Sequence, residues 1–474
     1  MEDVNVKGEL KNMSVKDALE LFEQAKQVAA TKQNTLLSWV TELPADTNVI
    51  NVFEKAASSF RGERFFWQDP EQGFTYVGLG VTNRYTAEEE DSFQGLKERM
   101  AELKKHLVTN KVEVGTGPLF MGGFRFDKEK AVAKEWHSFR KATFYLPLYL
   151  LSEVGGKVYL TVNTFVFPDD STKKWAAMKE QWERIISSDV PKLQAPELTL
   201  AKELDKDYFL QSTQEVIDLI NQSEKVNKVV MSRRMSLKFG KQVDNNYVLE
   251  KMLETQENSY FFIMENGNTS FFGASPERLI AINDDTLMSS CVAGSTPRGK
   301  TPEEDEKLGS VLLQDGKNVK EHHYVVDYMQ EKLAPFTNDL TLATDPILLK
   351  NRDIQHLYIR IEAEKKAEAE LLDILQTIHP TPALGGTPQK MAMQIIRLKE
   401  ELDRGFYGAP IGWIDFDGNG DFAVAIRSGL ITDANGYLYA GCGIVADSVP
   451  EEELQETAVK FQPMLRIMGG LKND

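Results

Sequence analysis

Three glutamates in the second half of the chain could together hold a hard metal ion. Glu453 and Glu456 lie three residues apart in PEEELQETAVKF (450–461), so they share one face of the helix that this segment predicts. Glu321 precedes two adjacent histidines, which point in different directions on a helix and cannot easily bind one ion together. A carboxylate suits a hard cation when other carboxylates join it. By spacing alone, however, Glu453, Glu456 and Lys460 are more typical of an exposed helix face with ion pairs.

The segment before this acidic helix favours a functional role for it. The run AGCGIV places Gly441 and Gly443 at the end of a predicted strand, and glycine lets the backbone approach a ligand closely. At this point two interpretations of the helix stay open, a ligand site and a solvated surface.

The stretch GSTPRGKT (294–301) matches the phosphate-binding pattern G-x-x-x-x-G-K-[ST] at every specified position. A strand-like run precedes it and a helix-like run follows it, as such a loop requires. However, Thr301 and Pro302 are typical of a helix start, and the four acidic residues 303–306 would repel a triphosphate at the helix N-terminus. The surrounding strands also look antiparallel, whereas phosphate-loop sheets are parallel. The sequence therefore argues against a P-loop NTPase.

The segment DFDGNGDF resembles the start of a calcium-binding loop. Asp415, Asp417 and Asn419 stand at ligand positions, but Ile426 occupies the twelfth position, where such a loop has a glutamate. The same segment is typical of a tight turn, and we predict a hairpin instead.

The elements that must position these residues begin with alternating helices and strands. Apolar periodicity predicts helices over 14–30, 171–188 and 207–222, with Ser14 and Asp17 as a capping box in the first. The run 148–165 predicts a hairpin around Gly155-Gly156.

The second half is predicted to be richer in strands. Strands are expected over KVVMSRRMSLKF (228–239), SYFFIME (259–265) and TSFFGAS (269–275), and helices over 302–313 and 318–330. GAPIGWIDF, DFAVAIRSGLI and YLYAGCGIV predict three antiparallel strands joined by DGNG and DANG turns. We interpret 189–204, with two prolines and little periodicity, as a linker between an N-terminal subdomain (1–204) and a second subdomain (205–474).

Composition excludes some classes of partner. The 474 residues include 55 Lys and Arg against 72 Asp and Glu, a net charge of −17, so we expect neither nucleic acid nor an anionic membrane as partner. A small anionic substrate remains compatible, because one arginine or metal ion can reverse the local field. Cys291 and Cys442 lie in apolar runs, which predicts that they are buried free thiols. The N-terminal segment is charged and lacks the apolar core of a signal peptide. These features predict a cytoplasmic protein.

Many of these segments resemble one enzyme family, the chorismate-utilising enzymes, which include the anthranilate, isochorismate and salicylate synthases. The resemblance runs in order over roughly 205 to 465, and MGGFRFD (121–127) resembles a segment in the first half of such enzymes. It implies one intertwined α+β unit with large antiparallel sheets packed face to face and helices outside. The matching segments are KVVMSRR (228–234), FFGASPERL (271–279), VAGSTPRG (292–299), KEHHYVVD (320–327), HPTPALGGTP (379–388), GFYGAPIGWID (405–415), FAVAIRS (422–428) and AGCGIVADSVPEEELQETAVK (440–460).

The resemblance also implies a role for each matching residue. Lys228 matches the catalytic base and Glu277 the general acid, which must be desolvated to stay protonated near neutral pH. Glu321 and Glu456 match ligands of Mg²⁺, with Glu453 close by as a direct or indirect partner. The resemblance implies that substrate is bound by Arg427 and Tyr407, by the backbone at Gly441, Gly443, Gly294 and Ser295, and by His379 and Lys460 as polar lining.

Two positions discriminate within the family. Anthranilate synthases usually have Gln where this chain has Lys228, so Lys228 favours addition of water rather than ammonia. Salicylate synthases tend to have Thr at the position of Ala383, so Ala383 and Leu384 favour stopping at isochorismate. The expected activity is thus the magnesium-dependent interconversion of chorismate and isochorismate. Salicylate or anthranilate synthesis is the alternative. The extended N-terminal part resembles enzymes of the menaquinone pathway.

Overall fold

The computed structural model describes residues 15–32, 34–88, 92–223 and 225–470. The N-terminal elements are α1 (Val15–Lys32), β1 (Thr35–Leu43), α2 (Val49–Lys55), α3 (Ala57–Phe60), β2 (Arg64–Gln68), β3 (Phe74–Ala87), α4 (Ser92–Lys104), β4 (Leu107–Thr109), β5 (Leu119–Phe124), β6 (Ala142–Val154), β7 (Lys157–Val166), α5 (Thr172–Ser187) and β8 (Leu198–Glu203).

The remaining elements are α6 (Lys206–Gln222), β9 (Lys228–Phe239), α7 (Asn245–Thr255), β10 (Tyr260–Asn266), β11 (Thr269–Ser275), β12 (Arg278–Asn283), β13 (Thr286–Pro297), α8 (Pro302–Gln314), α9 (Gly316–Leu333), β14 (Ile347–Lys350), β15 (Ile354–Glu364), α10 (Leu371–Ile378), β16 (Gly386–Thr387), α11 (Gln389–Lys399), β17 (Pro410–Asp415), β18 (Gly420–Val424), β19 (Ser428–Thr432), β20 (Asn435–Ile444) and α12 (Pro450–Ile467). Short 3₁₀ helices cover Lys134–Trp136 and Ala334–Phe336.

The strands of the described residues join one hydrogen-bonded network, which confirms the predicted α+β class with large antiparallel sheets. The pairing of β1 with β4 is parallel, and the other strand pairings are antiparallel. Strands of the two halves of the chain pair directly, β2 with β10 and β5 with β17. Residues 1–204 and 205–474 therefore share a sheet; their division into two subdomains stays a prediction.

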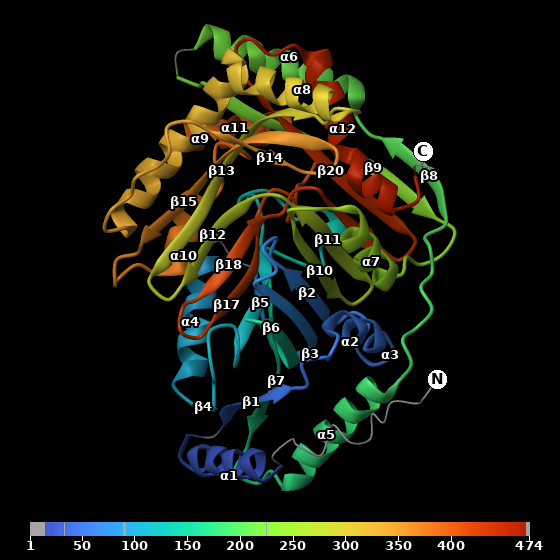
Figure 1. Cartoon of the computed structure of the whole chain (residues 1–474), viewed down its shortest axis with the longest axis vertical. Coiled ribbons are helices and arrows are strands. Elements are labelled where there is room, and N and C mark those ends of the chain that lie inside the picture. The colour runs from blue at the N-terminus through green and yellow to red at the C-terminus, as the bar shows by residue number, and fades with distance from the viewer. Residues whose placement is uncertain (1–14, 33, 89–91, 224, 471–474) are drawn as a thin grey trace.

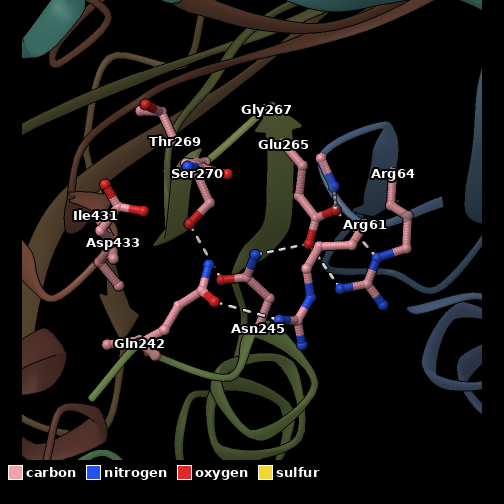
Figure 2. Close-up of a pocket in the computed structure, with 13 residues that line it drawn as sticks. Arg61, Arg64, Gln242, Asn245, Glu265, Gly267, Thr269, Ser270, Ile431 and Asp433 are labelled. Carbon is pink, nitrogen blue, oxygen red and sulfur yellow. Dashed lines mark hydrogen bonds and ion pairs between the residues drawn. The ribbon is translucent and has the colours of Figure 1, made fainter. Parts of the chain in front are cut away.

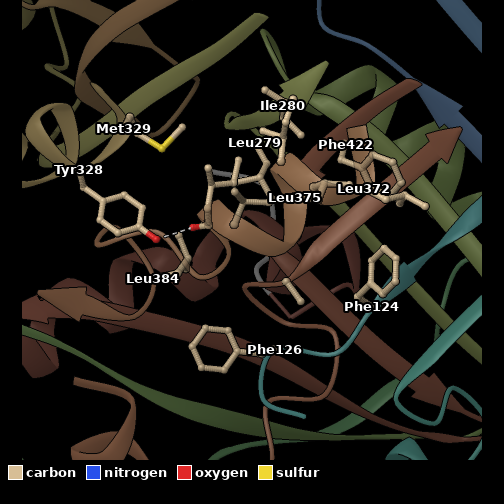
Figure 3. Packing of buried hydrophobic residues seen from close by; sticks show 14 of the residues in the cluster. Phe124, Phe126, Leu279, Ile280, Tyr328, Met329, Leu372, Leu375, Leu384 and Phe422 are labelled. Carbon is tan, nitrogen blue, oxygen red and sulfur yellow. Dashed lines mark hydrogen bonds between the residues drawn. The ribbon is translucent and has the colours of Figure 1, made fainter. Parts of the chain in front are cut away.

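Helices cover the two ends of the strand network. In Figure 1, α6, α8, α9, α11 and α12 gather at the upper end, over β9, β13 and β20, while α1 and α5 lie at the lower end. Buried aromatic and aliphatic side chains fill the space between sheet and helices. Figure 3 shows one such region, where Leu372 of α10 lies near Phe124 of β5 and Phe422 of β18.

Most predicted elements are confirmed, one predicted strand is wrong, and the predicted linker contains a strand that the sequence did not indicate. The hairpin over 148–165 is formed by β6 and β7, and Thr301 caps α8 by accepting a hydrogen bond from the N–H of Glu304. The predicted linker 189–204 instead contains β8, which pairs with β9. DFAVAIRSGLI is not one strand but two, β18 and β19, and residues 425–427 between them belong to neither strand. Ser14 of the predicted capping box lies outside the described residues.

Carboxylates of α8, the helix that follows the GSTPRGKT loop, accept hydrogen bonds from backbone amides of this loop. The N–H of Gly299 donates to Asp305 Oδ1 (3.0 Å) and the N–H of Lys300 donates to Glu304 Oε2 (2.9 Å). The strand that leads into this loop, β13, pairs antiparallel with both β12 and β15. The loop therefore lacks both the parallel sheet and the free amides that would bind a phosphate group.

The predicted hairpin at DFDGNGDF is confirmed as the turn between β17 and β18. Lys111 Nζ lies 2.7 Å from Asp415 Oδ2 and 2.7 Å from Asp417 Oδ2, so a lysine neutralises the carboxylates that resemble calcium ligands. None of the helices in the described part of the chain is both long and apolar enough to cross a membrane.

Candidate functional site

One cavity brings together most of the predicted site residues. It lies where β9, β13 and β20 meet α9 and α12, and it holds about 620 Å³ of empty space including the solvent at its mouth. Its lining combines a few charged and polar side chains with apolar ones, as binding sites for small molecules do. The predicted residues in its lining are Glu277, Gly294, Ser295, Glu321, Ala383, Leu384, Tyr407, Arg427, Gly441, Gly443, Glu456 and Lys460.

Lys228, the first residue of β9, lies behind this lining beside Glu321. Its side chain is 1% exposed, and its Nζ is 2.8 Å from Glu321 Oε1. Gly443 of β20 makes this arrangement possible, because a side chain there would overlap with Glu321 Oε1 and Lys228 Cε. Glu321 itself is presented by α9, whose first turn is capped by the side chain of Asp315.

Glu277 projects into the cavity from the segment between β11 and β12. Its backbone is fixed on both sides: its N–H donates to Ser275 Oγ (3.2 Å), and its carbonyl accepts from the N–H of Val424 (3.0 Å). Burial raises the pKa of Glu277 to about 8, although Lys228, Arg427 and Lys460 oppose that rise. The carboxyl group thus keeps its proton at neutral pH and can donate it.

The acidic helix predicted over 450–461 is α12, and Glu456 and Lys460 share the face that lines the cavity. Lys460 Nζ donates to Glu456 Oε1 (2.5 Å) and to the carbonyl of Gly441 (2.9 Å). Burial opposes ionisation of Glu456, but Lys460, Lys317 and Arg427 together outweigh it and hold the pKa of Glu456 below its usual range. The helix is therefore not the solvated surface that its spacing alone favoured.

Glu453 lies one turn earlier on α12 and outside the cavity lining. It is 2% exposed, and its Oε1 accepts from Lys317 Nζ at 3.0 Å. Burial and the neighbouring Glu456 raise the pKa of Glu453.

Arg427 sits at the break between β18 and β19. Its φ of 48° is in the left-handed region, which is uncommon for a residue other than glycine and often marks a functional position. Tyr407 is buried nearby and stacks on Tyr439 with 5.5 Å between ring centroids. Gly441 lies against Tyr407, since a Cβ there would lie 3.1 Å from the Tyr407 hydroxyl.

The cavity contains a histidine, but not the predicted one. His379 lies outside the lining: its Nε2 approaches the Phe126 carbonyl at 3.2 Å, and burial lowers its pKa to about 4. The histidine that does line the cavity is His356 of β15, whose Nδ1 is 2.8 Å from Ser295 Oγ and whose Nε2 is 3.4 Å from Arg427 Nη2. The alternating pattern of IQHLYIRIEAE indicates a strand, but it places His356 on the same face as the exposed Arg360 and Glu362. Alternation therefore gives no signal that His356 faces a cavity.

The donors of the cavity fit a divalent cation with few protein ligands. Among the residues that the structure describes, no three His, Cys, Asp or Glu side chains converge closely enough to hold a metal ion. Two carboxylates, Glu321 and Glu456, do face the same cavity, and each is now neutralised by a lysine. Magnesium takes one or two carboxylates and keeps several waters, so this sparse set suits it.

Comparison with known proteins places these residues in a wider group. Residues 22–469 match the family model of chorismate binding enzymes. The isochorismate synthase MenF of Bacillus subtilis (strain 168) is 35% identical over 463 residues, which cover 96% of this chain and 97% of that protein. The salicylate biosynthesis isochorismate synthase of Pseudomonas aeruginosa is 32% identical over 417 residues, covering 86% and 85%.

A solved structure shares the fold. The menaquinone-specific isochorismate synthase MenF of Escherichia coli superposes with a TM-score of 0.76 at 23% identity, covering 94% of this chain and 100% of that one. At this level of identity the likeness concerns the arrangement of helices and strands alone.

Proposed function

The chain belongs to the chorismate-binding enzyme family, and from that premise we propose that it is an isochorismate synthase, an enzyme that interconverts chorismate and isochorismate. The observation that carries this proposal is the similarity to such a synthase across nearly the whole of both chains. The cavity supplies groups suited to the chemistry.

The reaction adds water at C2 of chorismate and expels the hydroxyl group at C4, while the ring double bonds shift. It therefore needs a base for the attacking water, an acid for the leaving hydroxyl, and positive charge to hold the substrate carboxylates. The oxygen lost from C4 leaves as water once it is protonated, so atoms and charge balance.

We assign the acid to Glu277 and the base to Lys228. Glu277 lines the cavity and is held protonated by burial, which is the state in which an acid must begin. Lys228 Nζ would take the proton from the attacking water as a neutral amine, so the ammonium group that now pairs with Glu321 must first release its own proton to solvent. Its place beside Glu321 and Gly443 puts it at the same end of the cavity as the acidic residues.

The remaining residues would bind and orient the substrate. Arg427 can grip a carboxylate with two parallel hydrogen bonds, and Tyr407 can add a third. Gly441, Gly443, Gly294 and Ser295 bring backbone to the cavity wall, where Lys460 adds positive charge. Ala383 and Leu384 form an apolar part of the cavity lining. We propose that they favour release of isochorismate rather than its further conversion to salicylate.

Magnesium is the cofactor that we propose, with Glu321 and Glu456 as its protein ligands and Glu453 as their neighbour. When bound, Mg²⁺ supplies positive charge that holds the ring carboxylate of the substrate. The ion pairs with Lys228 and Lys460 are formed through Oε1 of each glutamate, and each carboxylate has a second oxygen that could bind the ion.

We also propose that the product feeds menaquinone biosynthesis, because the similarity to the Bacillus subtilis protein includes the N-terminal half. The two buried free thiols, Cys291 and Cys442, favour the reducing cytoplasm as its location.

Product analysis tests this proposal. Purified protein incubated with chorismate and Mg²⁺ is expected to give a mixture of chorismate and isochorismate by HPLC, and EDTA is expected to stop the conversion until excess Mg²⁺ restores it. Salicylate with pyruvate would assign the enzyme to the salicylate synthases. Anthranilate that forms only with ammonia would assign it to the anthranilate synthases, and no turnover would refute the proposal.

A further inference from the structure

A buried ion pair lies directly behind the cavity wall. Arg404 and Glu400 have side chains that are each 2% exposed. Arg404 Nη2 lies 2.5 Å from Glu400 Oε1, and Arg404 Nε lies 2.9 Å from Glu400 Oε2. Neither side chain is part of the cavity lining, and both are taken up by bonds to protein groups.

The pair connects two pieces of the cavity wall. Arg404 Nη1 donates to the carbonyl of Leu384 (2.9 Å), and its Nη2 donates to the carbonyl of Val230 (2.8 Å). Glu400 Oε1 accepts from the N–H of Ser232 (2.7 Å). Leu384 and Val230 both line the cavity.

The Leu384 segment in turn lies against the backbone of Lys228. The N–H of Val230 donates to the carbonyl of Gly385 (3.0 Å), and β16 pairs with β9 so that Thr387 is opposite Lys228. Gly386 has a φ of +129°, and a Cβ there would overlap the carbonyl oxygen of Lys228. Segment 383–387 and the start of β9 are therefore in direct contact, and Arg404 bonds to both.

Packing restricts Arg404 further. Its guanidinium carbon lies 4.2 Å from the centroid of the Phe126 ring. Figure 3 shows Phe126 and Leu384 on neighbouring parts of the same packed region. The planar guanidinium is thus held by an aromatic face, a carboxylate and two carbonyl groups, a combination that lysine cannot reproduce.

We propose that Arg404 and Glu400 are a positioning pair for the reaction. They fix Ala383 and Leu384 relative to Lys228, and this spacing determines how chorismate is held against the base. The inference rests on the proposed function for the identity of the substrate. Displacement of a reacting group by about 1 Å can cost about 100-fold in rate, so the pair should control turnover as well as folding.

The chain offers a matched control for the folding contribution. Arg64 and Glu265 form a second buried pair, also with both side chains 2% exposed, and with 2.6 Å between Nη2 and Oε1. Arg64 likewise donates to a carbonyl, that of Phe53, and its guanidinium carbon lies 4.2 Å from the Phe53 ring centroid. Figure 2 shows this pair near Asn245, in a different pocket from the proposed active site.

The test compares Arg404→Lys and Glu400→Gln with Arg64→Lys and Glu265→Gln. Steady-state kinetics with chorismate and Mg²⁺, normalised to folded protein by circular dichroism, and Tm are measured for all four. We expect Arg404→Lys to lower kcat/KM about 10- to 100-fold. Glu400→Gln keeps an acceptor for Ser232 and should lose less. Arg64→Lys and Glu265→Gln should lower Tm comparably but keep kcat/KM within about twofold of the parent.

Two results would overturn the inference: unchanged kcat/KM in Arg404→Lys and Glu400→Gln, or equal losses in the two pairs. If Arg404→Lys does not fold, Glu400→Gln alone decides by the same criterion. If the parent protein binds chorismate without converting it, the proposed function fails separately. The dissociation constant of chorismate, measured by calorimetry, then replaces kcat/KM, and equal values in parent and variants would refute the pair's role.

Discussion

Replacing Glu277 by glutamine is expected to lower kcat for chorismate conversion about 100- to 10,000-fold, the range typical of a general acid. Glutamine has nearly the same shape but has no acidic proton to give to the leaving hydroxyl group. Since Glu277 is buried and its backbone is held by Ser275 and Val424, the substitution should leave the fold intact. Initial rates by HPLC and the Tm by circular dichroism measure the two effects separately.

The pH dependence of kcat tests whether the carboxyl proton of Glu277 is the one that the reaction needs. The pKa of Glu277 is about 8, so its acid form predominates below that pH and disappears above it. We therefore expect kcat to fall as pH rises through about 8, and the residual activity of Glu277→Gln to lack this decline.

Glu54 is the control, because it is also buried and its pKa is raised to about 7, yet it lies outside the cavity. Glu54→Gln should keep the parent profile. An unchanged decline in Glu277→Gln would mean that another group is the acid.

The second large effect is expected at Lys228. Lys228→Met removes the proposed base and should lower kcat about 100- to 10,000-fold. Lys228→Arg keeps a positive charge beside Glu321, but an arginine stays protonated and cannot accept a proton from water. We therefore expect both variants to be inactive to a similar degree, with kcat measured from isochorismate formation.

This pair of variants separates two roles for Lys228. If the lysine only neutralises Glu321, Lys228→Arg should retain most of the parent activity, and that result would contradict its assignment as base. Lys300→Ala is the matched control. Lys300 is exposed and belongs to the phosphate-loop pattern, so its removal should leave kcat and KM unchanged.

Local patterns were sufficient to predict many elements of the fold. The run 228–239 forms β9 with the predicted bounds, because its apolar and β-branched residues are buried on both sides. Thr301 and Pro302 begin α8 as their side chains predict. These features depend on residues close in sequence, which is why the sequence alone indicates them.

The features of the fold that the sequence did not indicate depend on tertiary contacts. The break at 425–427 begins inside the apolar run 422–426, where Ala425 makes backbone hydrogen bonds with Gly408 and Ala409 instead of continuing the strand. β8 is an exposed strand that forms only by pairing with β9, so its own residues give a weak signal.

The candidate site, too, could be predicted from the sequence only in part. The cavity contains most of the residues that the family resemblance implied, yet His379 lies behind its wall and His356 takes the place facing Arg427. Arg404 and Glu400 gave no signal in the sequence, because their partners lie on segments that only the fold brings together. The roles of the cavity residues stay predictions until variants are measured.

The most direct test of the central claim follows the oxygen atom of the attacking water. Chorismate and Mg²⁺ are incubated with the protein in water enriched in heavy oxygen, and the isochorismate formed early in the reaction is analysed by mass spectrometry. We predict that it carries one heavy oxygen atom, at the C2 hydroxyl group, because that oxygen comes from solvent. Isochorismate without the label would contradict water addition by Lys228 and Glu277, and a reaction that yields no isochorismate would contradict the proposed function.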